Sequence, residues 1–180
     1  MDDRPAKFVA ETIKRCRDDD RSGNNAFRAA MRRADNPRTA AFAWPHLAEW
    51  CDIGREDERL PFALVAAAIA RESPDHDGNK DIGQLFKSCC ADQDDVEREQ
   101  RRFGRLVGCN NRIELCVVLR PVLRYLQSKI PEKIGYGEIG YTRLLKDILY
   151  YGERVKMRWA ANFFGRPTGF GDGENGHVSD

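Results

Sequence analysis

The most distinctive chemical pattern in this sequence is a set of arginines that recur four positions apart. The pairs are Arg101 with Arg105, Arg120 with Arg124, and Arg154 with Arg158. Residues four apart lie one above the other on a helix face, and the planar guanidinium group binds phosphate through two hydrogen bonds. The spacing therefore predicts a surface that holds a nucleic-acid backbone without reading its sequence.

The charges of the chain are unevenly distributed along its 180 residues. The totals of 30 Lys and Arg and 29 Asp and Glu give a net charge of only +1. Residues 101–129 nevertheless contain seven cations and one anion, a local net charge of +6, whereas acids gather at 18–20, 49–58 and 92–99. A neutral total thus conceals a basic second half. The alternative is that these arginines belong to solvated helix faces with scattered ion pairs.

Catalytic and metal-binding patterns are weak. The three histidines are isolated, and the sequence has neither a phosphate-binding glycine loop nor a C-x-x-C pair among its six cysteines. Asp75, His76 and Asp77 stand together, but such loose spacing is more typical of a solvated turn. We expect no enzyme activity, no cofactor and no metal, and we interpret the cysteines as reduced, mostly buried thiols of a cytoplasmic protein. The longest apolar run, 60–70, is too short to cross a membrane.

Helical periodicity dominates the chain, so we predict an all-α fold. Val155, Trp159 and Phe163, each four apart, predict an inward helix face with Trp159 in the core, and Asn111 with Glu114 resembles a helix N-cap. Pro121 should kink or divide its helix. Helices are expected at about 5–17, 24–33, 37–50, 60–72, 82–90, 96–108, 112–126, 141–151 and 155–163, with Asn36 and Pro37 starting the third and Leu60 and Pro61 the fourth.

Domain organisation follows from the charged segment near residues 92–95. We predict an N-terminal helical bundle over residues 1–91 and a C-terminal bundle over residues 96–166. The glycine-rich tail, residues 167–180, has little to bury and is expected to be disordered.

Six short motifs, taken in order, carry a resemblance to a known family. They are AAMRRA (29–34), DIGQLF (81–86), RRFGRLV (101–107), IELCVVLRPVLRYL (113–126), IGYTRLLKDILYY (139–151) and VKMRWAANFF (155–164). Their order and spacing resemble those of the CasB family, the small subunit of the type I-E CRISPR Cascade complex. The resemblance spans residues 24–164, while Pro121 and the tail depart from the family pattern.

The resemblance implies a non-enzymatic, all-α subunit acting in antiviral defence guided by CRISPR RNA. Such a subunit pairs with a second copy of itself, contacts other Cascade subunits, and touches the target or displaced DNA strand of the R-loop through a basic surface. The motif matches assign DNA contacts to Arg32, Arg33, Arg102, Arg120 and Arg158. The charge pattern alone adds Arg101, Arg105, Arg124, Arg143 and Lys146. The alternative is a purely architectural subunit whose arginines pair with acids of partner proteins.

Overall fold

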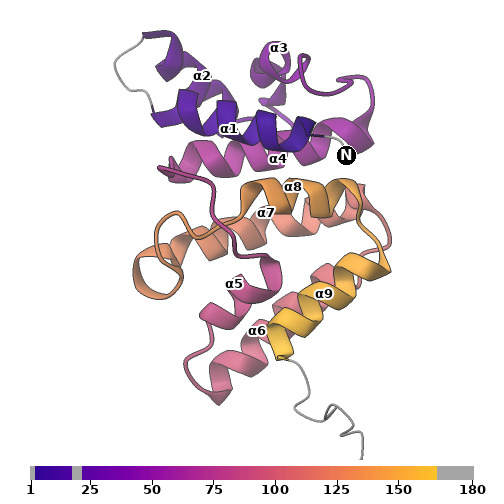
Figure 1. Ribbon diagram of the computed structural model, residues 1–180. Coiled ribbons are helices and arrows are strands. Elements are labelled where there is room, and N and C mark those ends of the chain that lie inside the picture. The colour runs from indigo at the N-terminus through magenta and orange to yellow at the C-terminus, as the bar shows by residue number, and fades with distance from the viewer. Residues whose placement is uncertain (1–2, 18–21, 166–180) are drawn as a thin grey trace, which may run out of the picture.

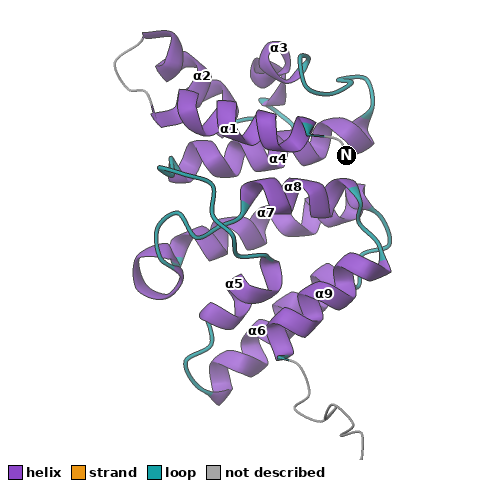
Figure 2. Cartoon of the chain, in the orientation of Figure 1, coloured by secondary structure: helices purple, strands orange, loops and turns teal. Residues whose placement is uncertain are grey.

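The computed structural model of this protein describes residues 3–17 and 22–165. Within them, the chain forms helices joined by loops and contains no strand, which confirms the all-α prediction (Figure 2). The α-helices are α1 (Arg4–Arg17), α2 (Ser22–Arg32), α3 (Trp44–Leu47), α4 (Glu56–Glu72), α5 (Ile82–Ser88), α6 (Gln93–Val107), α7 (Arg112–Ser128), α8 (Tyr141–Leu149) and α9 (Glu153–Phe164). A 3-10 turn (Ala40–Ala43) precedes α3, and a π turn (Ile130–Ile134) follows α7.

The helices are arranged in three tiers (Figure 1). Helices α1 to α4 form one end of the molecule, α7 and α8 lie in the middle, and α5, α6 and α9 form the other end. Helix α4 packs against both α7 and α8, while α5 packs most extensively against α9. The segment between α4 and α5 therefore runs from the first tier to the third and passes beside α8.

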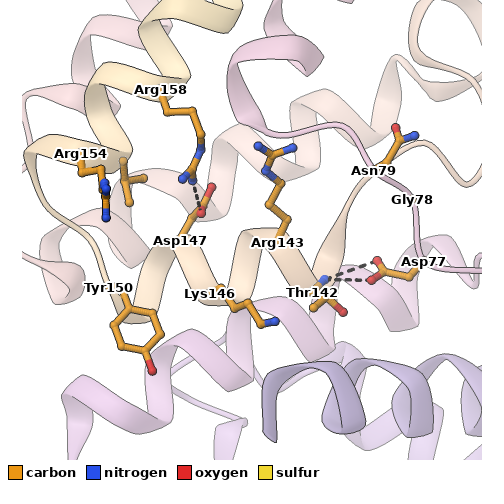
Figure 3. Close-up of a pocket in the computed structure, with 11 residues that line it drawn as sticks. Asp77, Gly78, Asn79, Thr142, Arg143, Lys146, Asp147, Tyr150, Arg154 and Arg158 are labelled. Carbon is orange, nitrogen blue, oxygen red and sulfur yellow. Dashed lines mark hydrogen bonds and ion pairs between the residues drawn. The ribbon is translucent and has the colours of Figure 1, made fainter. Parts of the chain in front are cut away.

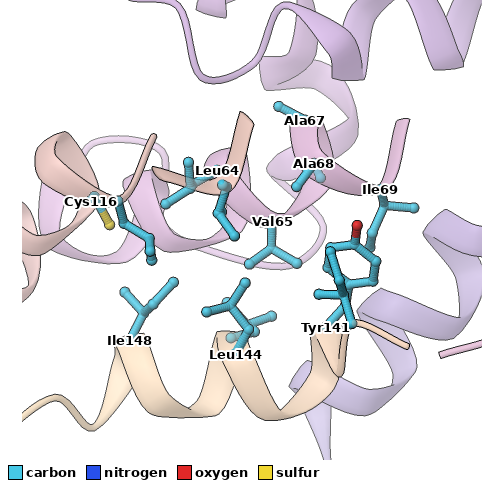
Figure 4. Packing of buried hydrophobic residues seen from close by; sticks show 14 of the residues in the cluster. Leu64, Val65, Ala67, Ala68, Ile69, Cys116, Tyr141, Leu144 and Ile148 are labelled. Atoms are coloured by element: carbon cyan, nitrogen blue, oxygen red, sulfur yellow. The ribbon is translucent and has the colours of Figure 1, made fainter. Parts of the chain in front are cut away.

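Helix α4 is the central helix of the core. Every residue from Pro61 to Ala70 is buried, as expected for a helix enclosed on all sides. Figure 4 shows Leu144 and Ile148 of α8 pointing toward Leu64 and Val65 of α4. The prediction of a helix buried between neighbours is confirmed.

Two predicted helix starts are wrong. Helix α4 begins at Glu56 instead of Leu60 and contains Pro61. Its first turn carries three acids, whose negative charges are stabilised by the positive end of the helix dipole. Asn36 does not start a helix, because its side-chain oxygen accepts a hydrogen bond from the Arg38 N–H at 3.1 Å and closes a turn. The predicted helix 37–50 is instead the 3-10 turn followed by the short α3.

Helix α7 agrees with its predicted start. The Asn111 side chain accepts the N–H of Glu114 at 2.9 Å, which confirms the cap. The Glu114 carboxylate accepts the N–H of Asn110 instead of that of Asn111, so the reciprocal box is displaced by one residue. Helix α7 continues through Pro121 without division.

Other expectations divide into those the structure bears out and those it leaves open. Trp159 is fully buried, and all the cysteines are free thiols, buried except for the half-buried Cys90. Among the described residues no helix is both long and apolar enough to cross a bilayer. The boundary between two bundles near residues 92–95 stays a prediction; α5 lies before it in sequence and packs on α9, which lies after it. The tail, residues 167–180, lies outside the described residues.

Candidate nucleic-acid interface

A groove of about 830 Å³ lies between α8, α9 and the segment 77–79 (Figure 3). Four cations line it: Arg143 and Lys146 from α8, and Arg154 and Arg158 from α9. Two carboxylates, Asp77 and Asp147, are also in the lining. The groove therefore has a local excess of positive charge, which is the electrostatic requirement for a polyanion site.

Helix α8 presents its polar face to this groove because its sequence is amphipathic. Arg143, Lys146 and Tyr150 follow one another at spacings of three and four, while Leu144 and Ile148 on the other side are buried against the core. Tyr150, just past the end of α8, is exposed over 66% of its surface at the edge of the groove. An aromatic ring next to cations is a common feature of single-strand nucleic-acid sites.

The loop that precedes α5 is fixed against the start of α8 by Asp77. Its carboxylate accepts the backbone N–H of Tyr141 at 2.7 Å and that of Thr142 at 3.2 Å. These are two of the N–H groups that a helix start leaves without a partner in its own helix. Asp77 is therefore a capping residue, and no group of three potential metal ligands occurs in the part of the chain that the structure describes.

Arg158 is held between two buried carboxylates. One of its terminal nitrogens bonds to Asp147, whose second oxygen accepts the indole N–H of Trp159 at 2.7 Å. Its Nε lies 3.8 Å from Oδ2 of Asp81, the N-cap of α5. The same Asp81 oxygen lies 3.9 Å from Arg143. Arg158 thus ties α9 to both α8 and α5.

Lys146 and Arg154 are the groove cations without such partners. Among the described residues, neither side chain forms an ion pair or a hydrogen bond, and both line the groove. Their charges are available to a ligand. Arg154 belongs to one of the four-apart arginine pairs of the sequence, but neither the family motifs nor the charge pattern assigned it a DNA contact.

A second group of predicted arginines lies where α6 meets α7. Arg102 bonds to the buried Glu99 carboxylate at 2.6 Å and lies over the ring of Tyr125, 4.1 Å from its centre. The Tyr125 hydroxyl donates to the same carboxylate, and the pKa of Tyr125 is raised by burial and by this hydrogen bond. Arg105 lines a shallow hollow together with Arg102 and Tyr125. Arg102 is therefore largely satisfied within its own chain.

The remaining predicted arginines of α6 and α7 differ in their partners. Arg124 lies 3.3 Å from Asp35, which also binds Arg71 at 2.9 Å. Arg101 is exposed and Arg120 half-buried, and neither forms an ion pair with the described residues. These two keep their charge for a partner molecule.

The α2 arginines form a third group, separate from the other two. Arg32 donates its Nε–H to the carbonyl of Ala70 at 2.9 Å, and Arg33 lies 5.7 Å from the centre of the Phe42 ring. Both line one hollow together with Arg28. The structure thus brings together Arg143, Lys146 and Arg158 in the groove, and it distributes the other predicted residues over α2 and the α6–α7 surface.

Comparison with known proteins gives consistent matches over most of the chain. A family model described as CRISPR-associated protein Cse2 matches residues 27–164. Two crystal structures from Thermus thermophilus are similar, one of CasB and one of a CRISPR-associated protein of the Cse2 family. Each is 26% identical with a TM-score of 0.61, and the alignment covers 89% of this chain and 97% of the other. A search of the curated proteins gives no match.

Proposed function

We propose that this chain, which belongs to the Cse2 family of CRISPR-associated proteins, is the non-catalytic small subunit of a type I-E Cascade complex and holds a DNA strand of the R-loop. In such complexes, pairing between guide RNA and target reads the sequence, so a protein subunit needs only backbone contacts to stabilise a strand. This role requires cations that are positioned but not neutralised.

The observation that carries the proposal is the α8–α9 groove. Lys146 and Arg154 line it without an ion-pair partner among the described residues, and the exposed ring of Tyr150 lies beside them. Phosphates of an extended strand would pair with the two cations, and a base would stack on the ring. The carboxylates of the groove do not oppose this, because Asp77 caps α8 and Asp147 is paired with Arg158.

The proposed setting follows from the family. The chain would associate with other Cascade subunits around the CRISPR RNA, pair with a second copy of itself, and act in the cytoplasm during antiviral defence. In this setting its own affinity for DNA need only prolong the life of an R-loop that base pairing has formed.

The test is a Cascade complex reconstituted with Lys146→Ala and Arg154→Ala combined. Removing one cation that pairs with a phosphate of a single strand should lower the slope of log K against log salt by about 0.7, so the double variant should flatten it by about 1.4. The R-loop should also dissociate faster. The matched control is Lys7→Ala with Lys14→Ala, which removes two exposed cations from α1. An unchanged slope and R-loop lifetime in an intact complex would refute the proposal.

A purely architectural role is the second candidate, because Arg102 and Arg124 are paired with Glu99 and Asp35 of their own chain and so have less charge to offer a DNA strand. Under this alternative, reversing an unpaired charge such as Arg101→Glu should prevent assembly of the complex. Under the proposed role, the complex should assemble and DNA retention should change. Size-exclusion chromatography of the reconstituted complex distinguishes these outcomes.

A further inference from the structure

A second polar hollow, of about 530 Å³, adjoins the groove. It lies where α5, the end of α9 and the segment 79–80 meet, and its lining includes Lys80, Lys87 and Asn162. Asn79 lines both this hollow and the α8–α9 groove. The two depressions are therefore neighbours on one surface, although none of the arginine pairs in the sequence points to the second.

Asp81 links residues that line the two depressions. It is buried and accepts the Gln84 N–H at 3.0 Å and the side-chain N–H of Asn162 at 2.6 Å. Its Oδ2 also lies within 3.9 Å of Arg143 and Arg158, which line the groove. One carboxylate thus joins the lining of the hollow to the lining of the groove, so the distance between the two is set by the fold.

The charge of the hollow is suited to an anion. Its lining contains two lysines and no carboxylate. Lys80 is partly engaged, because its Nζ donates to the Ile134 carbonyl at 3.3 Å and lies 3.4 Å from Glu138. Lys87 is exposed and forms no ion pair with the described residues. Its ammonium group is available to a ligand.

We propose that this hollow extends the nucleic-acid site, so that a single strand held at Lys146 and Arg154 continues past Asn79 and places a further phosphate at Lys87. The inference rests on the proposed function and lengthens the stretch of DNA strand that the chain contacts. Asn79 supplies an exposed amide at the passage between the two depressions, where it can hydrogen-bond a sugar or a phosphate. The contacts remain independent of sequence.

The test measures binding of oligothymidylates of two lengths to the full chain by fluorescence anisotropy at several salt concentrations. Single-strand-binding OB folds cover about 4–16 nucleotides, so an oligomer of about 6 nucleotides lies at the lower end of this range and one of about 20 nucleotides exceeds it. The longer oligomer is therefore the one expected to span both depressions. Lys87→Ala should weaken binding of the long oligomer by about tenfold, as expected for one charge-assisted contact, and lower its salt slope by about 0.7. Binding of the short oligomer should be unchanged.

The controls separate this inference from the proposed function. Lys14→Ala, an exposed lysine on α1, should leave both oligomers unaffected, and Lys146→Ala with Arg154→Ala should weaken both. If Lys87→Ala binds both oligomers like the wild type while the double variant loses both, the extension is wrong and the groove stands. If the wild-type chain binds neither oligomer even at low salt, the extension is wrong, whereas the proposed function is refuted only by the reconstituted Cascade complex described above.

Discussion

Replacing Gly83 by alanine should separate α5 from α9 and destabilise the tier that contains α9, one wall of the groove. A Cβ atom at Gly83 would lie 2.0 Å from the carbonyl oxygen of Trp159 and 3.1 Å from Cβ of Asn162. The nearest atom belongs to the backbone of α9, so no side-chain rotation relieves the overlap. Restoring an ordinary contact requires the two helices to move apart by about 1 Å or more.

The size of the effect follows from two opposing terms. Alanine is favoured over glycine within a helix by about 0.5–1 kcal/mol, whereas forcing an extra methyl group into a packed interface costs about 1–3 kcal/mol. The overlap is with backbone, so the cost falls at the upper end of this range, and subtracting the helix gain leaves a net loss of about 2–2.5 kcal/mol. For a chain of this size, each kcal/mol corresponds to about 2–4 °C, so the melting temperature should fall by about 4–10 °C.

Gly104 on α6 provides a matched control, because a Cβ there has no neighbour within 4 Å. Gly104→Ala should raise the stability by about 0.5–1 kcal/mol, the intrinsic gain alone. Thermal unfolding followed by circular dichroism measures both variants. A melting temperature of Gly83→Ala at or above the wild-type value would refute the close α5–α9 packing from which the site was built.

Three further predictions concern polar groups that are buried or half-buried. Asp81→Ala should lower the free energy of unfolding by about 1–2 kcal/mol, because it removes the α5 cap; Asp81→Asn keeps an acceptor and should cost less in the same urea titration. Burial raises the pKa of Glu72 above its ordinary value, so the folded state keeps this proton to higher pH than the unfolded chain. The stability of the wild type relative to Glu72→Gln is therefore greatest below the ordinary pKa and should fall as the pH rises through the raised pKa, as urea unfolding at several pH values would show. Burial also raises the pKa of Cys116 to about 12, so its thiol should react with a disulfide reagent at mildly alkaline pH only when the chain unfolds.

The sequence predicts those parts of the fold in which apolar spacing determines the buried face. Val155, Trp159 and Phe163 are the buried residues of α9, because residues four apart share one side of a helix and all three are apolar. The prediction of a helix starting at Asn36 is wrong for a specific reason. The same side-chain oxygen serves as a helix cap or as a turn acceptor, and the local sequence does not distinguish the two.

The candidate site is less predictable, because the state of each cation depends on partners distant in the sequence. Arg124 pairs with Asp35, which lies 89 residues away. Spacing shows that Arg120 and Arg124 share a helix face, but it contains no information about which acid the fold brings to that face. The hollow around Lys87 could not be predicted from spacing, because its lining comes from α5, the end of α9 and the segment 79–80, which only the fold brings together.

The last prediction concerns the difference between paired and unpaired cations of the groove. Arg158, which matches the family motif, is paired with carboxylates, whereas Lys146 and Arg154 are not in the part of the chain that the structure describes, so their removal should affect stability differently. Arg158→Ala would leave Asp81 and Asp147 without their shared counterion. Removing one partner of a fully buried ion pair costs about 3–5 kcal/mol; with 35% of the Arg158 side chain exposed, we expect about 2–3 kcal/mol.

Urea unfolding of Arg158→Ala beside Arg154→Ala tests this assignment. Arg154→Ala should unfold like the wild type and lower the salt slope for DNA, whereas Arg158→Ala should lose stability first. If Arg158→Ala were as stable as the wild type and still lost DNA, its guanidinium would be a ligand contact instead of a structural one. A destabilised variant binds DNA less because less of it is folded. Replacing Lys146 and Arg154, which have no structural partner among the described residues, therefore measures their direct contribution to DNA affinity.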